Sequence, residues 1–163
     1  MSNLNQLLSL FELQDTPRLI LLNARELKDA HVPPFQPDFP VLIWGEFSLN
    51  LDEIRKILQT TYVDSHPLRL AAKSGTITNV NLGLLIASEQ DAEINAIYIP
   101  PLEAGTSLSA FQEIIAHLRA PDGCPWDKKQ THQSLRQHLL EESYEALEAM
   151  DAGDSAGMAE EFG

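Results

Sequence analysis

Three glutamates lie close together in the C-terminal third of the sequence, at Glu141, Glu142 and Glu145. The run Ser134–Ala149 around them contains no Gly or Pro and is rich in Leu, Glu, Gln and Ala, so it is predicted to be a helix. At about 100° per residue, Glu145 lies about 40° and Glu142 about 100° from Glu141. The three carboxylates therefore share one face, where a hard divalent cation such as Mg²⁺ or Mn²⁺ would relieve their mutual repulsion.

The opposite side of this helix is apolar and is predicted to be buried. Its apolar residues are Leu139, Leu140, Ala146, Leu147 and Met150. Ser134 is the expected N-cap, because its hydroxyl can accept a hydrogen bond from a free N–H group of the first turn. The helix is thus expected to bury one side and to present its carboxylates on the other.

A second acidic segment follows a short break at Asp151–Asp154 and carries Glu160 and Glu161. Between Glu141 and Gly163 there are eight acidic residues and no Lys or Arg. An acidic helix face by itself is typical of a solvated surface. Two such faces brought together by an antiparallel helix pair would be stabilised by a cation, so the two segments together favour a metal site.

The motifs around these glutamates resemble those of the MazG-type nucleotide pyrophosphohydrolase domain, from about Phe111 to Gly163. They read Cys-Pro-Trp-Asp-x-x-Gln-Thr-His-x-Ser-Leu from Cys124, Leu-Leu-Glu-Glu-x-Tyr-Glu-x-x-Glu-Ala from Leu139, and Glu-Glu-Phe-Gly from Glu160. The resemblance implies an all-helical segment that forms a homodimer. It also implies hydrolysis of nucleoside triphosphates to the monophosphate and pyrophosphate with Mg²⁺, for which Mn²⁺ is an alternative.

The resemblance further implies roles for individual residues. The family signature, Glu-Glu-x-x-Glu followed by Glu-x-x-Asp, assigns metal binding to Glu142, Glu145 and Glu161. Glu141 is the expected catalytic carboxylate, which would orient or deprotonate the water that attacks the α-phosphorus. The Asp of the signature would fall one position after Gly163, so a shortened member of the family with weak or no activity is expected. The alternative is a non-catalytic helical fragment used for interaction or dimerisation.

Three residues before the glutamates are candidates for substrate binding: Trp126, Lys128 and Arg136. Trp126 can stack on a nucleobase or pack as a hinge against the following helix. Lys128 and Arg136 can neutralise triphosphate oxygens or balance the neighbouring carboxylates. Asp127 is expected to cap the segment Lys128–His132.

Other reactive side chains are given structural interpretations. Cys124 is interpreted as a small buried hydrophobic residue and not as a nucleophile, because the sequence shows no base paired with it. His132 and His138 lack the Cys and His neighbours of a zinc site, so surface or supporting roles are expected. The predicted chemistry therefore rests on the carboxylates.

The overall charge argues against several classes of partner. The 163 residues include 24 acidic and 11 basic side chains, for a formal net charge of −13. Nucleic-acid backbones and anionic membrane surfaces attract clustered Lys and Arg, so neither is an expected partner. The single cysteine excludes an internal disulfide, and no apolar run approaches membrane-spanning length. The N-terminus has no secretion signal, and the protein is expected to be cytoplasmic.

Short apolar runs of strand length alternate with helical patterns over the first hundred residues. Strands are predicted at Arg18–Asn23, Pro40–Trp44, Leu68–Lys73, Thr76–Leu82 and Ala96–Ile99, and helices at 4–13, Leu51–Thr61 and Leu84–Ala87. Asn50 is the expected cap of the second helix. The expected fold class is α+β overall, with an α/β unit of mixed sheet and helices over residues 1–100, a linker over 101–106 and an all-α segment over 107–163.

The first unit resembles, more loosely, the C-terminal half of a tetrapyrrole-methylase-type domain. The resemblance rests on the prolines at 33–40, on Pro40–Gly45 and on His66-Pro67. The glycine-rich loop that helps that family to hold S-adenosylmethionine is absent, so no methyl transfer is expected. A structural role is predicted for this unit, with a vestigial regulatory binding site as the alternative.

The segment after the linker begins with a further amphipathic pattern. Ser107 or Ser109 is expected to cap a helix that ends at Arg119. The stripe predicted to be buried consists of Phe111, Ile114, Ile115 and Leu118.

Overall fold

The computed structural model describes residues 3–86, 93–103 and 107–162. The chain divides into two compact units, residues 1–112 and 113–163, and the division falls inside helix α3 (Leu108–Arg119). The first unit contains a sheet with helices and the described part of the second is helical, so the predicted α+β class is confirmed. Among the described residues, no helix combines the length and the apolarity that crossing a bilayer requires.

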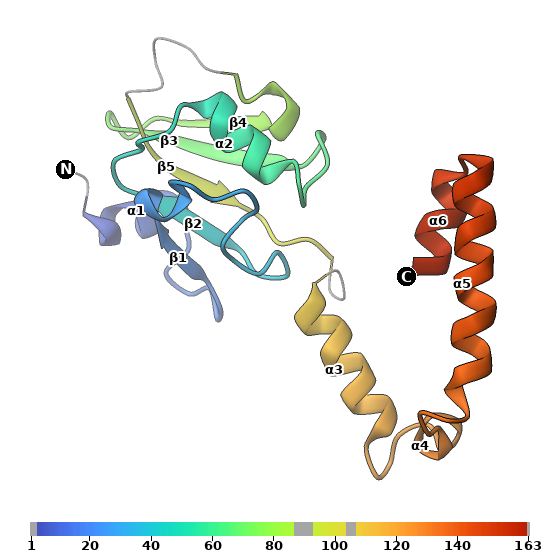
Figure 1. The fold of residues 1–163 in the computed structure, drawn as a ribbon. Coiled ribbons are helices and arrows are strands. Elements are labelled where there is room, and N and C mark those ends of the chain that lie inside the picture. The colour runs from blue at the N-terminus through green and yellow to red at the C-terminus, as the bar shows by residue number, and fades with distance from the viewer. Residues whose placement is uncertain (1–2, 87–92, 104–106, 163) are drawn as a thin grey trace. The chain divides into compact units, whose positions relative to one another are not determined.

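The first unit is built on a five-stranded mixed sheet (Figure 1). Its strands are β1 (Ile20–Asn23), β2 (Val41–Trp44), β3 (Pro67–Ala72), β4 (Ile77–Asn81) and β5 (Ile94–Ile99). They lie in the order β1-β2-β5-β3-β4, with β1 and β2 parallel and the other neighbouring pairs antiparallel. Each strand corresponds to one predicted from an apolar run, with ends shifted by one or two residues.

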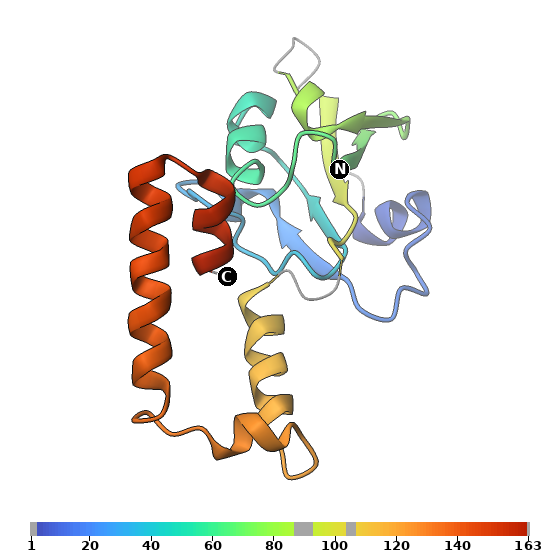
Figure 2. The same ribbon diagram turned by 90° about the vertical axis from the view of Figure 1, so that its right-hand side faces the viewer.

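Alternating side chains of the sheet contribute to two separate cores. In β2, Val41 and Ile43 belong to the core that contains α2 (Leu51–Leu58), whereas Leu42 belongs to the core that contains α1 (Leu4–Leu10). The two helices therefore cover opposite faces of the sheet (Figures 1 and 2). All three β2 side chains are fully buried, and burial of each is worth roughly 1.5–3 kcal/mol.

The start of α2 is fixed by the cap that the sequence predicts. Asn50 Oδ1 accepts a hydrogen bond from the Glu53 N–H at 2.9 Å, and Glu53 Oε2 accepts one from the Asn50 N–H at 2.9 Å. This reciprocal capping box satisfies two N–H groups that would otherwise be free.

Two short helical turns depart from the prediction. The turn predicted at Leu84–Ala87 is a 3₁₀ helix, η2, over Leu82–Leu84, and Ala87 lies outside the described residues. A further 3₁₀ helix, η1 (Ala24–Leu27), follows β1 and is capped by Asn23. Its four residues are too few to show a helical period, so the sequence pattern did not indicate it.

The proline-rich loop after η1 holds the chain where α3 begins. The Ser107 hydroxyl donates to the Asp38 carboxylate, and Gln36 Nε2 donates to Ser109 Oγ at 2.8 Å. Ser107 Oγ also accepts from the Ala110 N–H at 3.1 Å. The predicted serine cap is thus confirmed at Ser107.

The described residues of the second unit form helices only. After α3 come α4 (Pro125–Lys129), α5 (Leu135–Ala152) and α6 (Ser155–Phe162). Helices α5 and α6 are in contact and run antiparallel, side by side in both views (Figures 1 and 2).

The first turn of α5 corrects two predicted caps. Ser134 has helical dihedrals and caps nothing downstream. Its hydroxyl instead accepts from the Thr131 N–H at 3.0 Å, while Thr131 Oγ1 accepts from the Ser134 N–H at 3.1 Å. Thr131 is therefore the capping residue, and its carbonyl also accepts from the Leu135 N–H. Asp127 does not cap either, because it lies within α4, where Cys124 occupies the N-cap position.

The apolar stripes predicted to be buried on α3 and α5 are mostly exposed. No described residue of α3 is buried, and in α5 only Ala146 is. Leu139 of α5 is 70% exposed. The prediction was wrong because helical spacing identifies an apolar face but does not provide the surface that covers it.

Candidate metal centre

The turn between α5 and α6 fixes how the two helices meet. Gly153 ends α5 in the left-handed conformation at φ 68°, which favours glycine. Asp154 then caps α6, because its Oδ1 accepts from the N–H groups of Ala156 and Gly157, each at 3.1 Å. The break predicted at Asp151–Asp154 is shorter in the structure, because Asp151 and Ala152 belong to α5 and the break is a C-cap at Gly153 followed directly by an N-cap at Asp154.

Small residues let α6 approach α5 closely. Ala146 is 5% exposed, the lowest exposed fraction along α5. A Cβ atom added to Gly157 would lie 2.8 Å from Asp154 Oδ2 and 3.4 Å from the Cβ of Ala149, so a glycine at this position leaves room for the Asp154 cap beside α5. This close approach brings the acidic faces of the two helices together.

Three carboxylates converge between the helices. Glu142 and Glu145 project from α5 and Glu161 from α6, and one oxygen of each lies within 4.8 Å of the others. Glu142 and Glu145 are exposed, and Glu161 is partly buried. A set of three carboxylate oxygens has the chemistry that Mg²⁺ and Mn²⁺ prefer, and it lacks the thiolate and imidazole groups that favour zinc. The residues present therefore fit a hard divalent cation.

The electrostatics of the cluster agree with this fit. Partial burial, and then a hydrogen bond with Glu142, raise the pKa of Glu161 above the usual glutamate value. The negative charges of Glu145, Glu142 and Glu160 raise this pKa further. A carboxyl group shifted in this direction is one whose negative charge is poorly compensated, and a cation would supply the compensation.

Glu141 lies next to this cluster but points to a different set of partners. Gln137 Nε2 donates to Glu141 Oε1 at 3.0 Å, and His138 Nδ1 lies 3.7 Å from Glu141 Oε2. Both partners come from the preceding turn of α5, at the i−4 and i−3 positions. They hold the carboxylate on the face of α5 that carries Glu142 and Glu145.

The three predicted substrate-binding residues lie in different surroundings. Trp126 of α4 is 58% exposed, and its ring meets that of His138 at a centroid distance of 6.5 Å. Lys128 Nζ donates to the Pro121 carbonyl at 2.7 Å, so it stabilises the turn before α4. Arg136 is exposed, and at about 100° per residue it lies on the side of α5 away from the carboxylates. Of the three, Trp126 is the one in contact with a residue of the acidic face.

Sequence reasoning gave His138 a surface or supporting role and missed Gln137, the other side chain that holds Glu141. A signal for both contacts was available in their spacing. Residues three and four positions apart on a helix are neighbours, and both precede Glu141 at that spacing. The contact between His138 and Trp126 has no such signal, because the residues belong to different helices.

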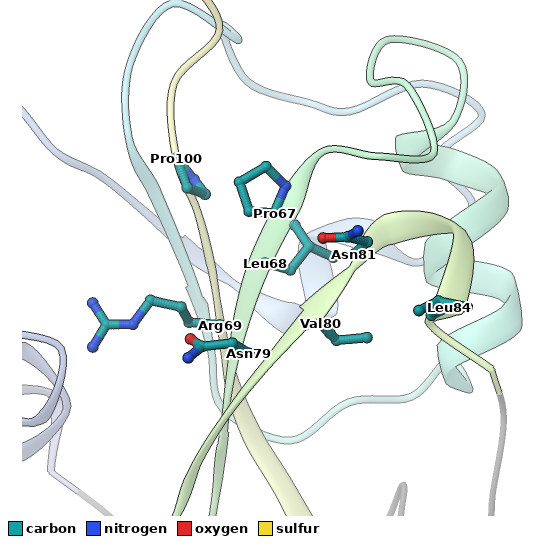
Figure 3. A pocket seen from close by; sticks show the side chains of 8 residues that line it. All are labelled: Pro67, Leu68, Arg69, Asn79, Val80, Asn81, Leu84 and Pro100. Atoms are coloured by element: carbon teal, nitrogen blue, oxygen red, sulfur yellow. The ribbon is translucent and has the colours of Figure 1, made fainter.

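The first unit carries a concave surface whose lining has no catalytic groups. It is an open depression of about 440 Å³, lined by residues of β3, β4, η2 and Pro100 (Figure 3). Arg69 is the charged residue of its lining, and its Nη1 donates to the Phe11 carbonyl at 3.2 Å. The amides of Asn79 and Asn81 are the other polar side chains there. With no acid, base or nucleophile in the lining, this depression offers no means of catalysis.

Comparison with known proteins shows that the acidic helices are similar to a known domain family. Residues 130–163 match the model of the MazG nucleotide pyrophosphohydrolase domain. This segment is therefore similar to part of a MazG-type domain. The MazG match covers α5 and α6, and hence Glu141 and the three clustered carboxylates.

Individual relatives extend this result. Uncharacterized protein YabN of Bacillus subtilis is 38% identical over 123 residues, which is 71% of this chain and 25% of the relative. Nucleoside triphosphate pyrophosphohydrolase/pyrophosphatase MazG of Thermotoga maritima is 48% identical over 61 residues, 37% of this chain and 24% of the relative. Nucleoside triphosphate pyrophosphohydrolase of Escherichia coli K12 is 43% identical over 51 residues, 31% of this chain and 19% of the relative.

The chain spans about a quarter or less of the length of these relatives. The match to YabN is long enough to include residues of the first unit as well as of the second. No solved structure matches the chain. The MazG segment therefore carries the functional inference, and the first unit is characterised by its fold.

Proposed function

We propose that the helices of the second unit form a metal-dependent nucleoside triphosphate pyrophosphohydrolase site, which releases the nucleoside monophosphate and pyrophosphate. The observation that carries this proposal is the convergence of Glu142, Glu145 and Glu161 within 4.8 Å. The match of the same residues to the MazG domain model supports it, as do the names of the T. maritima and E. coli relatives.

In this proposal Glu142, Glu145 and Glu161 hold Mg²⁺ or Mn²⁺. The ion supplies Lewis-acid stabilisation of the negative charge on the triphosphate. Without that compensation, the eight carboxylates between Glu141 and Gly163 would repel a polyphosphate.

Glu141 is the proposed general base. Its carboxylate takes the proton of the attacking water while the water oxygen bonds to the α-phosphorus. The bond from the α-phosphorus to the bridging oxygen breaks, and pyrophosphate leaves with the electron pair. Gln137 and His138 orient the Glu141 carboxylate for this transfer, since they lie against its two oxygens.

Turnover by this chain should be weak. Two of the three clustered carboxylates are exposed to water, and electrostatic stabilisation of a transition state is smaller in water than in a water-excluded site. The 163-residue chain is therefore expected to bind metal more readily than it turns over substrate.

The exposed leucines of α5 favour a homodimer as the functional state. Leu139 is 70%, Leu140 59% and Leu147 54% exposed. A contiguous apolar face of this kind is a site of association, and a second copy of the chain supplies a matching face. The same leucines support the alternative function, in which the helices serve for interaction without catalysis.

Pyrophosphate release with Mg²⁺ tests the proposal. The parent chain should release a small but measurable amount from nucleoside triphosphates. Glu142→Gln combined with Glu145→Gln should abolish release, and Glu141→Gln should lower it while metal binding persists. Equal release from the parent and the double variant would contradict the enzyme assignment. Light scattering on the same samples should show a dimer that Leu140→Glu weakens.

A further inference from the structure

Helix α4 is held in place by hydrogen bonds at both ends. Arg119 Nη1 donates to the Asp127 carbonyl at 2.9 Å, and Lys128 Nζ donates to the Pro121 carbonyl at 2.7 Å. Gln130 Nε2 donates to the Trp126 carbonyl at 3.3 Å. These side chains tie the five residues of α4 to the segments before and after it. Trp126 is therefore presented from an anchored backbone.

The indole of Trp126 is not used to fill a core. It is 58% exposed, and its ring contact is with His138, at a centroid distance of 6.5 Å and an interplanar angle of 60°. An edge-to-face pair of this geometry covers at most one face of the indole. Because 58% of the residue is exposed, much of the indole stays accessible to a flat ring from solution.

His138 connects this aromatic surface to the acidic face of α5. Its Nδ1 lies 3.7 Å from Glu141 Oε2, and Glu142 and Glu145 follow it by four and seven residues. At about 1.5 Å per residue, they lie about 6 Å and 10 Å further along the axis of α5. In a nucleotide, one sugar and its 5′ linkage separate the base from the α-phosphate. This separation is comparable to the distance along α5 from His138 to the carboxylates.

Of the parts of the substrate, the base is the one that can bind the aromatic surface at Trp126. The phosphates need a cation on the acidic face, whereas the base is uncharged and aromatic. Stacking on an aromatic side chain tolerates every base, because each base has a π-face. Such a surface would distinguish nucleotides from polyphosphates without a base, and it would distinguish little between the bases.

We propose that Trp126 is the surface on which the nucleobase stacks, and that His138 is a positioning residue that sets the angle of the indole beside Glu141. This proposal rests on the proposed function, which does not say how the base of the substrate is recognised. The triphosphate is selected by carrying a base, and Trp126 recognises that base.

Tryptophan fluorescence provides a direct test, because the chain has only two tryptophans, Trp44 and Trp126. In the Trp44→Phe variant all tryptophan emission comes from Trp126. The probes are α,β-methylene ATP and α,β-methylene CTP, which cannot be cleaved to pyrophosphate, and inorganic tripolyphosphate, all with Mg²⁺. Both nucleotides should quench the emission, and tripolyphosphate should bind without quenching it.

Substitutions then separate stacking from general damage. Trp126→Ala should weaken the binding of both nucleotides about tenfold and leave the affinity for tripolyphosphate unchanged. Trp126→Phe should retain most of the affinity for the nucleotides. His138→Ala should raise KM for nucleotides about threefold through Trp126, and it should also lower kcat, because His138 orients Glu141. His138→Phe should restore KM if the ring acts through Trp126. A KM that Phe does not restore would contradict the positioning role and would assign His138 to Glu141 alone.

The outcomes distinguish this proposal from the function on which it rests. If tripolyphosphate binds with Mg²⁺ as tightly as the nucleotides, base stacking is refuted and the metal site stands. If neither ligand binds with Mg²⁺ present, the proposed function fails and base stacking fails with it. Should Trp44→Phe not fold, calorimetry on the parent, Trp126→Phe and Trp126→Ala gives the same comparison without fluorescence.

Discussion

Removing one carboxylate from the cluster between α5 and α6 should weaken metal binding by a calculable amount. Glu142→Gln keeps the size and the helix propensity of the side chain while deleting one of three negative charges. The oxygens of the cluster lie within 4.8 Å of one another, so a single ion can interact with all three. The substitution therefore isolates the electrostatic contribution of one ligand.

The magnitude follows from the exposure of the cluster. Two unit charges about 4 Å apart attract by about 1 kcal/mol in bulk water, and a divalent ion doubles this to about 2 kcal/mol per carboxylate. The high dielectric constant of water applies here because Glu142 and Glu145 are exposed. Since about 1.4 kcal/mol corresponds to a factor of ten, Glu142→Gln should raise the Kd for Mn²⁺ about thirtyfold. With Glu145→Gln added, the increase should be about a thousandfold.

Calorimetric titration with MnCl₂ measures this change, and Asp151→Asn is the matched control. Asp151 is on the same helix, and its substitution changes the net charge equally. It lies six residues after Glu145, about 9 Å along the axis, which is close to the screening length at physiological ionic strength. Its Kd should change by less than about threefold. If Glu142→Gln weakens the binding of Mn²⁺ no more than Asp151→Asn does, the clustered carboxylates act only through net charge and the reasoning is wrong.

Three further predictions concern stability and pH. Asn50→Ala removes the capping box of α2 and should destabilise the first unit by about 1 kcal/mol, measured as a lower Tm. His66 is 8% exposed and burial lowers its pKa, so the unfolded state binds protons more readily. The free energy of unfolding of the first unit should therefore fall as pH drops below about 6.5, and His66→Gln should remove this dependence in a pH series of denaturant titrations. The raised pKa of Glu161 has two consequences of opposite sign as pH falls from about 7 to about 5. Mn²⁺ affinity should decrease, while the metal-free helix pair should become more stable to heat in circular dichroism.

The sequence was most informative where a local pattern has a single structural solution. The five strands follow from short apolar runs, and the cap of α2 follows from Asn50 and Glu53 at capping-box spacing. The shared face of Glu142 and Glu145 follows from their separation of three residues on a helix. In each case the interacting groups are neighbours along the chain, so the helix or strand period determines their relation.

Prediction failed where several local solutions compete. Ser134 and Thr131 are both acceptable caps, and the reciprocal pair that they form moves the cap to Thr131, three residues earlier than predicted. Burial of the apolar stripes of α3 and α5 was predicted from period alone, although Leu139 is 70% exposed. A period specifies which residues share a face, and it carries no information about what lies opposite that face.

The metal cluster depends both on the period of one helix and on the contact between two helices. Its residues could therefore be predicted from the sequence, but its geometry could not. Glu142 and Glu145 are related by the period of α5, but Glu161 comes from α6. Its position depends on the left-handed Gly153, the cap at Asp154 and the close approach at Gly157. All three features lie within the eight residues before Glu161, so the pairing of α5 with α6 is a local structure. A cation bound between Glu161 and the α5 carboxylates would link the two helices directly. Metal binding should therefore be coupled to the stability of this helix pair, because an ion that binds only the paired form shifts the equilibrium toward it.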